Sequence, residues 1–182
     1  IIAIFLLFSL TACLETILLG AAGSGYLIAR DKSLGDSLED NKIHAKIVKD
    51  LVKYNKDGPF TNVNVFVYQG RVLLTGFTEQ PQAMKDALEI IWKNPEVKEV
   101  INELADKKVK FSRLKDSYLA NNIKTRLIRD QTVSALNINI RGFASQVYLI
   151  GSVDNQQQIR QAADLASRVR GVKLVVSHLR AS

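Results

Sequence analysis

The chain contains one sequence pattern twice, at a spacing of about 75 residues. Residues from about Asp40 to Leu104 correspond to residues from about Asp116 to Leu179. The small and apolar positions agree along this unit, in pairs such as Val63 and Ile138, Val65 and Ile140, Val72 and Val147, Gly76 and Gly151, and Val97 and Val172. Such self-similarity predicts two copies of one small domain, and function should then follow from how the copies differ. A unit of about 65 residues can fold alone, although with little stability to spare.

Each unit predicts the same series of elements. In the first, Ile43, Ile47 and Leu51 recur at helical spacing, and two alternating strands then meet at a Gln69-Gly70 turn. A second helix, for which we expect Thr78 as the N-cap, leads to a last strand. The last strand follows the second through a helix, so those two strands can lie parallel, whereas the hairpin is antiparallel. We therefore expect an α+β fold of two tandem αββαβ domains, each a three-stranded mixed sheet covered by two helices.

The N-terminal segment differs from both repeats. Residues 1–12 form an apolar run that ends in small residues, as in a secretory signal peptide, and Ile1 in place of a start methionine predicts that its first few residues are missing. The segment Leu10-Thr11-Ala12-Cys13 resembles a bacterial lipobox, in which the cysteine is lipidated. Cys13 is the only cysteine, so no internal disulfide can form. The alternative is an uncleaved membrane helix from Ile1 to about Ala29, which is long enough to span a bilayer.

These patterns divide the chain into four parts. Residues 1–12 are the signal peptide, and residues 13–38 are the lipidated cysteine and a flexible tether that contains several glycines. The two repeats then occupy residues 39–107 and 113–182. By resemblance to sorted lipoproteins, Leu14 after the cysteine, in place of an aspartate, favours the outer membrane.

The repeats resemble the BON domain family. The resemblance rests on the αββαβ order, on the glycine that closes the second strand, and on the Val-x-x-Val-x-x-x-Leu ending at residues 97–104 and 172–179. The segment from Ala166 to Lys173 is especially similar, whereas Ser177-His178 and Pro95-Glu96 depart from the pattern. With the lipobox, the chain is similar to dual-BON outer-membrane lipoproteins. That resemblance implies a non-enzymatic envelope protein associated with phospholipid, with osmotic or envelope stress and with membrane integrity.

The two repeats carry very different charge. Residues 39–107 hold 10 basic and 11 acidic side chains, whereas residues 108–182 hold 13 basic and 4 acidic ones. The excess positive charge therefore belongs to the second repeat, which predicts a polyanionic partner. Nucleic acid is such a polyanion, but an exported, membrane-tethered chain does not meet it. Nucleic-acid binding becomes a candidate function only if the interpretation of the N-terminus is wrong.

The opening helix of the second repeat is the candidate contact. Leu119, Ile123 and Leu127 form its core stripe, and a tyrosine and arginines follow one another on a neighbouring face. Tyrosine suits the depth of lipid headgroups, and guanidinium groups pair with phosphate. The residues expected to bind anionic phospholipid are Tyr118, Asn122, Lys124, Arg126 and Arg129. Two alternatives remain, a basic face that is merely solvated and the docking of an acidic envelope protein.

Nothing in the sequence predicts catalysis. His44 and His178 lie at non-equivalent places and lack partners at metal-ligand spacing, so we expect neither a metal nor a cofactor. The glycines of residues 20–25 do not follow a strand and lack the lysine of a phosphate-binding loop. We interpret Trp92 as a packing residue. The predicted protein is a lipid-anchored, periplasm-facing outer-membrane protein without enzymatic activity.

Overall fold

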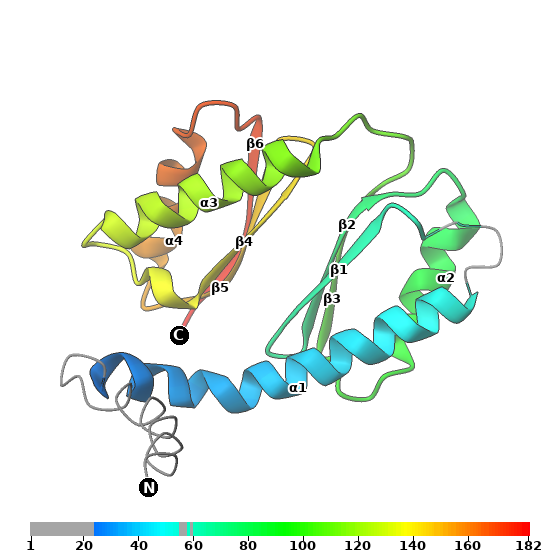
Figure 1. The fold of residues 1–182 in the computed structure, drawn as a ribbon, viewed down its shortest axis with the longest axis horizontal. Coiled ribbons are helices and arrows are strands. Elements are labelled where there is room, and N and C mark those ends of the chain that lie inside the picture. The colour runs from blue at the N-terminus through cyan, green and yellow to red at the C-terminus, as the bar shows by residue number, and fades with distance from the viewer. Residues whose placement is uncertain (1–23, 55–57, 59) are drawn as a thin grey trace, which may run out of the picture. The chain divides into compact units, whose positions relative to one another are not determined.

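The repeat in the sequence becomes two domains of the same topology. The computed structural model describes residues 24–54, 58 and 60–182, with side chains described from Leu38 onward. The elements of the first domain are α1 (Ser24–Tyr54), β1 (Val63–Tyr68), β2 (Arg71–Phe77), α2 (Pro81–Trp92) and β3 (Glu99–Ala105). Those of the second are α3 (Arg113–Arg129), the short 3-10 helix η1 (Ala135–Asn137), β4 (Ile138–Phe143), β5 (Gln146–Val153), α4 (Gln156–Ser167) and β6 (Leu174–Ala181). This confirms the predicted pair of αββαβ domains (Figure 1).

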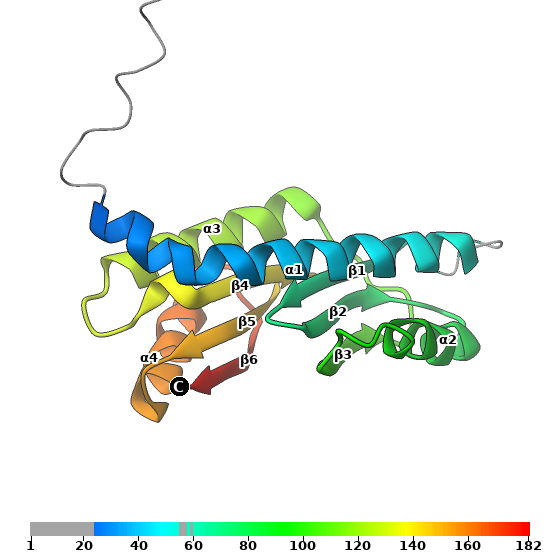
Figure 2. The same ribbon diagram turned by 90° about the horizontal axis from the view of Figure 1, so that it is seen from below.

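Each domain contains a mixed sheet of three strands. The orders are β1-β2-β3 and β4-β5-β6, with an antiparallel hairpin followed by a parallel strand that arrives through a helix. Ile43, Ile47 and Leu51 of α1 belong to the core of the first domain together with Ala87 and Ile91 of α2. Helices α3 and α4 supply the corresponding side chains of the second core. Two helices thus pack on each sheet, as the sequence predicted (Figures 1 and 2).

An aspartate holds the hairpin turn of each domain. Asp40 of α1 accepts hydrogen bonds from the backbone N–H groups of Gln69 (2.7 Å) and Gly70 (2.9 Å). In the second domain, Asp116 accepts from Ala144 (3.0 Å) and Ser145 (2.8 Å). Both turns have positive φ at their two central residues, as expected of tight hairpins whose twist matches that of the strands. The same carboxylate-to-turn contact thus fixes the first helix on the sheet in both copies.

A glycine near the end of the second strand is required in both domains. Gly76 has φ 120° and Gly151 has φ 149°, a region that side chains of L-residues rarely allow. A Cβ atom at Gly76 would lie 1.9 Å from the carbonyl oxygen of Asn62, and one at Gly151 would lie 1.9 Å from that of Asn137. The chain that enters the first strand therefore passes directly against the glycine.

The faces of the two sheets that the helices leave open share one further hydrophobic cluster. Leu73, Phe77 and Ile101 of the first domain join Phe143, Tyr148 and Ile150 of the second. Every residue of β2 is buried, so this strand is covered on both faces. Burial, with the nearby charge of Glu103, raises the pKa of Tyr148 to about 12. Residues 39–182 accordingly form one compact unit.

Charged side chains surround this shared cluster. Glu99 of β3 accepts hydrogen bonds from Arg71 of its own sheet and from Arg180 of β6, the latter at 2.8 Å. Arg71 also donates to the backbone carbonyl of His178 (3.0 Å). The His178 ring lies 2.9 Å from a carboxylate oxygen of Glu103. The two domains therefore meet through hydrogen bonds and through ion pairs between individual side chains of opposite charge.

Three details differ from the sequence-based expectations. Residues 24–38 are helical, although the tether was predicted to be flexible as far as residue 38. Residues 26–38 contain no proline and include three leucines, an alanine, an arginine and a lysine, which are compatible with a helix. Gln80, rather than Thr78, precedes α2, and its side chain makes no capping bond. Trp92 is 54% exposed, so its interpretation as a packing residue was wrong.

The predicted signal peptide, the lipobox and Cys13 lie outside the described residues, and they stay predictions. Within the described part of the chain, none of the helices combines the length and the apolar character that crossing a bilayer requires.

Candidate membrane-contact site

Helix α3 is positioned by its cap and by its apolar stripe. The Ser112 side chain accepts a hydrogen bond from the N–H of Lys115 at 3.4 Å and so begins the helix. Leu119, Ile123 and Leu127 are fully buried in the core of the second domain, as the sequence predicted. The opposite side of the helix therefore faces solvent, with arginines in the last turn where the helix dipole favours positive charge.

Four of the five predicted site residues line one shallow cleft on this exposed side. The cleft has a volume of about 350 Å³, and its lining comprises Tyr118, Asn122, Thr125, Arg126, Arg129, Val169 and Arg170. Val169 and Arg170 come from the turn that follows α4, a helix that packs beside α3. Three guanidinium groups and one phenol therefore gather around the same hollow.

The positive charge of this cleft is not neutralised within the described part of the chain. Each of the four acidic residues of the second domain is engaged elsewhere. Asp116 holds the hairpin turn, and Asp130 accepts from the backbone and side chain of Thr132. Asp154 accepts from Ser134 and Gln158, and Asp164 pairs with Arg168. Among these residues, none of the cleft's three arginines has a carboxylate partner.

Lys124, the fifth predicted residue, is separate from the cleft. Its ammonium group donates to the backbone carbonyls of Ala135 and Ile138, both at 2.8 Å. Burial lowers the pKa of Lys124 below the ordinary value of a lysine. The lysine therefore secures the 3-10 helix η1 against α3, and its charge is not presented with those of the arginines.

Sequence reasoning missed two residues of this surface. Arg170 joins the cleft from a turn some forty residues further along the chain. No periodicity reveals that contact, because it depends on how α4 packs on α3. Leu114 was detectable: it stands four residues before Tyr118 and thus on the same face of α3. Leu114 is 87% exposed and Tyr118 is 65% exposed.

We call the surface formed by Leu114, Tyr118, Asn122, Arg126, Arg129 and Arg170 the arginine face. It presents Tyr118 in the same cleft as three guanidinium groups, with exposed Leu114 about one helical turn before Tyr118. Such a combination suits the boundary between lipid headgroups and acyl chains, where apolar side chains insert and arginines meet phosphates in a planar, two-point contact. Within the described residues, no group of three or more His, Cys, Asp or Glu side chains is arranged to hold a metal ion.

Comparison with known proteins identifies the repeated domain. The family model of the BON domain matches residues 39–105 and again residues 115–182. The chain belongs to the BON domain family. The two matches correspond to the two αββαβ domains, and the arginine face, apart from Leu114, lies within the second match.

Several known proteins are similar to most of the chain. A protein of Anaplasma centrale, described as an uncharacterized protein in the gshII 5' region, is 34% identical over 79% of this chain and 95% of its own length. The outer membrane lipoprotein DolP of Haemophilus influenzae is 31% identical over 92% of this chain and 87% of its own. The osmotically-inducible protein Y of Escherichia coli is 28% identical over 81% of this chain and 75% of its own.

Proposed function

We propose that this protein is an outer-membrane lipoprotein whose second BON domain binds anionic phospholipid through the arginine face. The observation that carries the proposal is the cluster of Arg126, Arg129 and Arg170, which lacks acidic partners among the described residues and shares a cleft with exposed Tyr118. The role is one of binding rather than catalysis, and it supports the integrity of the outer membrane under osmotic or envelope stress.

The proposed location rests on the N-terminus and on the relatives. Cys13 stands at the end of a lipobox-like segment and is the only cysteine of the chain. One relative, which the chain matches over nearly its whole length, is named an outer membrane lipoprotein, and another is named for osmotic induction. We propose by analogy that Cys13 anchors this chain to the outer membrane and that the two BON domains face the periplasm.

The strength of the contact follows from its charges. Each basic residue close to an anionic bilayer contributes roughly 1 kcal/mol. Three arginines therefore give about 3 kcal/mol, to which insertion of a leucine and a tyrosine adds. An affinity of this size is weak for a free protein, yet it is sufficient for a domain that a lipid anchor already holds near the surface, because tethering raises its effective concentration.

The test is co-sedimentation of residues 24–182 with vesicles. Binding is expected on vesicles that contain phosphatidylglycerol and absent on purely zwitterionic ones, and it should weaken as salt screens the charges. The double variant Arg126→Glu and Arg129→Glu should lose binding. The matched control is Lys85→Glu with Arg160→Glu, which changes the net charge equally at exposed positions outside the arginine face.

The alternative function is an envelope adaptor whose basic second domain docks an acidic protein. The same charges favour it, and exposed Leu114 and Tyr118 suit a protein interface as well as a membrane, so the vesicle experiment has to separate the two. Equal loss of vesicle binding in the control variant would show that net charge alone is responsible and would contradict a defined site. Absence of binding to every vesicle would favour the adaptor.

A further inference from the structure

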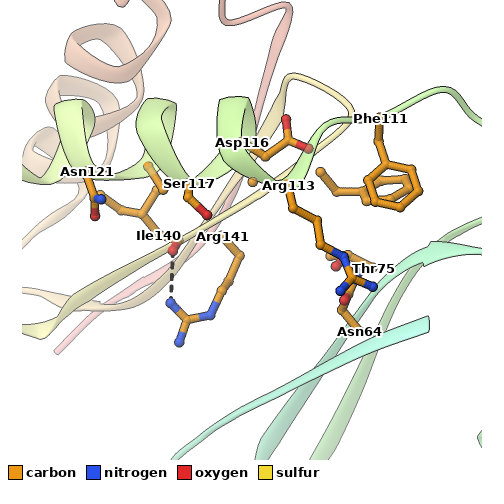
Figure 3. A pocket seen from close by; sticks show the side chains of 12 residues that line it. Asn64, Thr75, Phe111, Arg113, Asp116, Ser117, Asn121, Ile140 and Arg141 are labelled. Carbon is orange, nitrogen blue, oxygen red and sulfur yellow. Dashed lines mark hydrogen bonds between the residues drawn. The ribbon is translucent and has the colours of Figure 1, made fainter. Parts of the chain in front are cut away.

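A second and larger cleft lies where the two BON domains meet. It has a volume of about 550 Å³ and is distinct from the arginine face. Its polar lining comprises Asn64, Thr75, Arg113, Asp116, Ser117, Asn121 and Arg141. Asn64 and Thr75 are paired neighbours on β1 and β2 of the first domain, whereas the other residues belong to α3 and β4 of the second. Figure 3 shows Arg113 extending from α3 toward Thr75 and Asn64, with Arg141 directed from β4 into the same region.

Arg141 is held in place without an ionic partner. Its guanidinium carbon lies 3.6 Å from the centre of the Phe66 ring, and one terminal nitrogen donates to the carbonyl of Ile140 at 3.0 Å. Stacking and one backbone bond fix the plane of the guanidinium but leave its remaining N–H groups available. Desolvation lowers the pKa of Arg141, although the residue as a whole is still exposed to solvent and can therefore be reached by a ligand.

The other arginines at this domain boundary are neutralised. Arg71 and Arg180 share the carboxylate of Glu99. Among the described residues, by contrast, neither Arg113 nor Arg141 contacts a carboxylate. Two guanidinium groups therefore line one cleft without a carboxylate partner among the described residues, and that of Arg141 is held in a fixed plane, which favours an anion as the ligand.

The only acidic residue in the lining of this cleft does not supply that anion. Asp116 is 4% exposed, and its two carboxylate oxygens accept the N–H groups of Ala144 and Ser145. The helix that carries it is also fixed, because a Cβ at Gly142 would lie only 2.7 Å from the Asp116 carbonyl oxygen. Asp116 therefore belongs to the rigid floor of the cleft and is committed to the hairpin turn.

We propose that this cleft binds a phosphate group. A phosphate offers enough oxygens for two guanidinium groups and for further donors, which Ser117, Asn121, Asn64 and Thr75 provide around the cleft. Phe111, Ile140 and Phe143 also line the cleft, and their apolar side chains can contact the organic part of a phosphorylated molecule. Because the lining comes from both BON domains, the ligand stabilises their docked arrangement.

The proposal is independent of membrane binding by the arginine face. The phosphate group has two sources, a free or small phosphorylated molecule and the headgroup of a phospholipid. Inorganic phosphate and glycerol phosphate represent the first source, and glycerophosphoglycerol, the headgroup of phosphatidylglycerol without its acyl chains, represents the second.

The experiment is a nuclear magnetic resonance titration of residues 24–182, a chain that contains all three core clusters. Each of the three compounds is added, with sodium chloride at equal ionic strength as the reference. Saturable shifts of the amides around Arg113, Ser117 and Arg141 are expected. Arg141→Lys retains the charge and the contact with Phe66 but loses the planar fork, and it should weaken binding at least about tenfold.

Two further variants make the test decisive. Arg113→Gln alters an exposed side chain without a recorded contact, so it should fold normally and also weaken binding about tenfold. Arg160→Gln removes the same charge on the exposed side of α4 and should bind as the parent does. Preference for inorganic or glycerol phosphate assigns a small ligand, whereas preference for glycerophosphoglycerol assigns a lipid headgroup.

Several results would overturn the proposal. One is a response to sodium chloride equal to that to phosphate, and another is unchanged affinity in both Arg113→Gln and Arg141→Lys. Equal weakening by Arg160→Gln would reduce the effect to net charge. Vesicle binding by Arg141→Lys is expected to be normal. The phosphate titration and the vesicle experiment therefore test the cleft and the arginine face separately.

Discussion

The first helices of the two BON domains have the same core and opposite surfaces. Ile43, Ile47 and Leu51 of α1 occupy the places of Leu119, Ile123 and Leu127 of α3, at a constant spacing of 76 residues. At that same spacing, the counterparts of Tyr118, Asn122, Arg126 and Arg129 are Lys42, Lys46, Asp50 and Lys53. Shared positions therefore hold the fold, and the differing positions give each copy its surface.

One lysine of this face of α1 is paired with an acidic side chain, whereas the arginines of the arginine face have no carboxylate partner among the described residues. The Lys46 ammonium lies 3.0 Å from the Asp50 carboxylate, and this hydrogen bond holds the pKa of Asp50 below its ordinary value. The first domain also has Pro95 where the second has Arg170. Outside this pair α1 keeps Lys42, Lys49 and Lys53, and its last residue, Tyr54, is exposed. The face that corresponds to the arginine face nevertheless has lysines and an aspartate in place of the tyrosine and the arginines, so we place the proposed lipid contact on the second domain.

The largest expected effect is on the feature that both domains share. Replacing Gly151 with alanine should destabilise the protein by about 3 kcal/mol or more, because φ is unfavourable and the backbone carbonyl of Asn137 must move. Gly76→Ala should cost a similar amount, since its geometry is equivalent. Urea unfolding followed by circular dichroism measures both free energies of unfolding. The control is Gly58→Ala, where φ is also positive but the added Cβ meets no close atom, so its loss of stability reports backbone strain without the steric clash. A small loss at Gly76 with a large one at Gly151 would break the equivalence of the copies.

The second effect distinguishes the two turn-holding aspartates. Asp116 is buried, so Asp116→Ala leaves two backbone N–H groups without their acceptor and should cost about 2–3 kcal/mol. Asp40 makes the same two bonds in a more exposed place, where water can replace it, and Asp40→Ala should cost about 1 kcal/mol. Unfolding midpoints in urea show which of the two variants is destabilised more. Equal losses would mean that burial does not distinguish the turns.

Repeats and periodicity predict most of this architecture, because each helix and strand has an apolar pattern of its own. The contact between the sheets was not anticipated, although its signal is present. Leu73 and Phe77 of β2, with Tyr148 and Ile150 of β5, place large apolar side chains on the face that the helices do not cover. A sheet with one face in water would have alternated with polar residues there.

The candidate site shows the same division. Tyr118 and Arg126 follow from helical spacing, because both belong to one helix. Arg170 does not, since a packing contact between helices brings it near. The structure places Lys124 apart from the cleft, with hydrogen bonds to backbone carbonyls around η1 that helical spacing does not reveal. Spacing within one element is readable from sequence, whereas contacts between elements require the fold.

A third effect concerns Glu99, whose carboxylate pairs with Arg71 of the first domain and Arg180 of the second. Burial alone would raise the pKa of Glu99, but the hydrogen bond from Arg71 and the charges of Arg71 and Arg180 outweigh it, and the pKa lies below its ordinary value. A lowered pKa in the folded state stabilises the fold above the ordinary value of about 4.3 and is lost as pH falls through the folded-state value. We expect the parent to be more stable than Glu99→Gln at about pH 7 and the difference to shrink at about pH 3. Urea titrations at both pH values check this, and a constant difference would exclude a role for ionisation.

The smallest expected effect is on vesicle binding by a variant in which part of the arginine face is transferred to α1. Lys42→Tyr with Asp50→Arg gives α1 the tyrosine and the first arginine of α3 and removes the ion pair with Lys46. In the background of Arg126→Glu and Arg129→Glu, these changes should restore part of the binding to anionic vesicles, by about 1–2 kcal/mol, because each added base near the surface contributes roughly 1 kcal/mol. Asp50→Arg alone is the control for charge and should restore less, since no aromatic ring accompanies it. If the single and double variants bind equally, charge without the tyrosine accounts for the contact, and the difference between the two BON domains reduces to electrostatics.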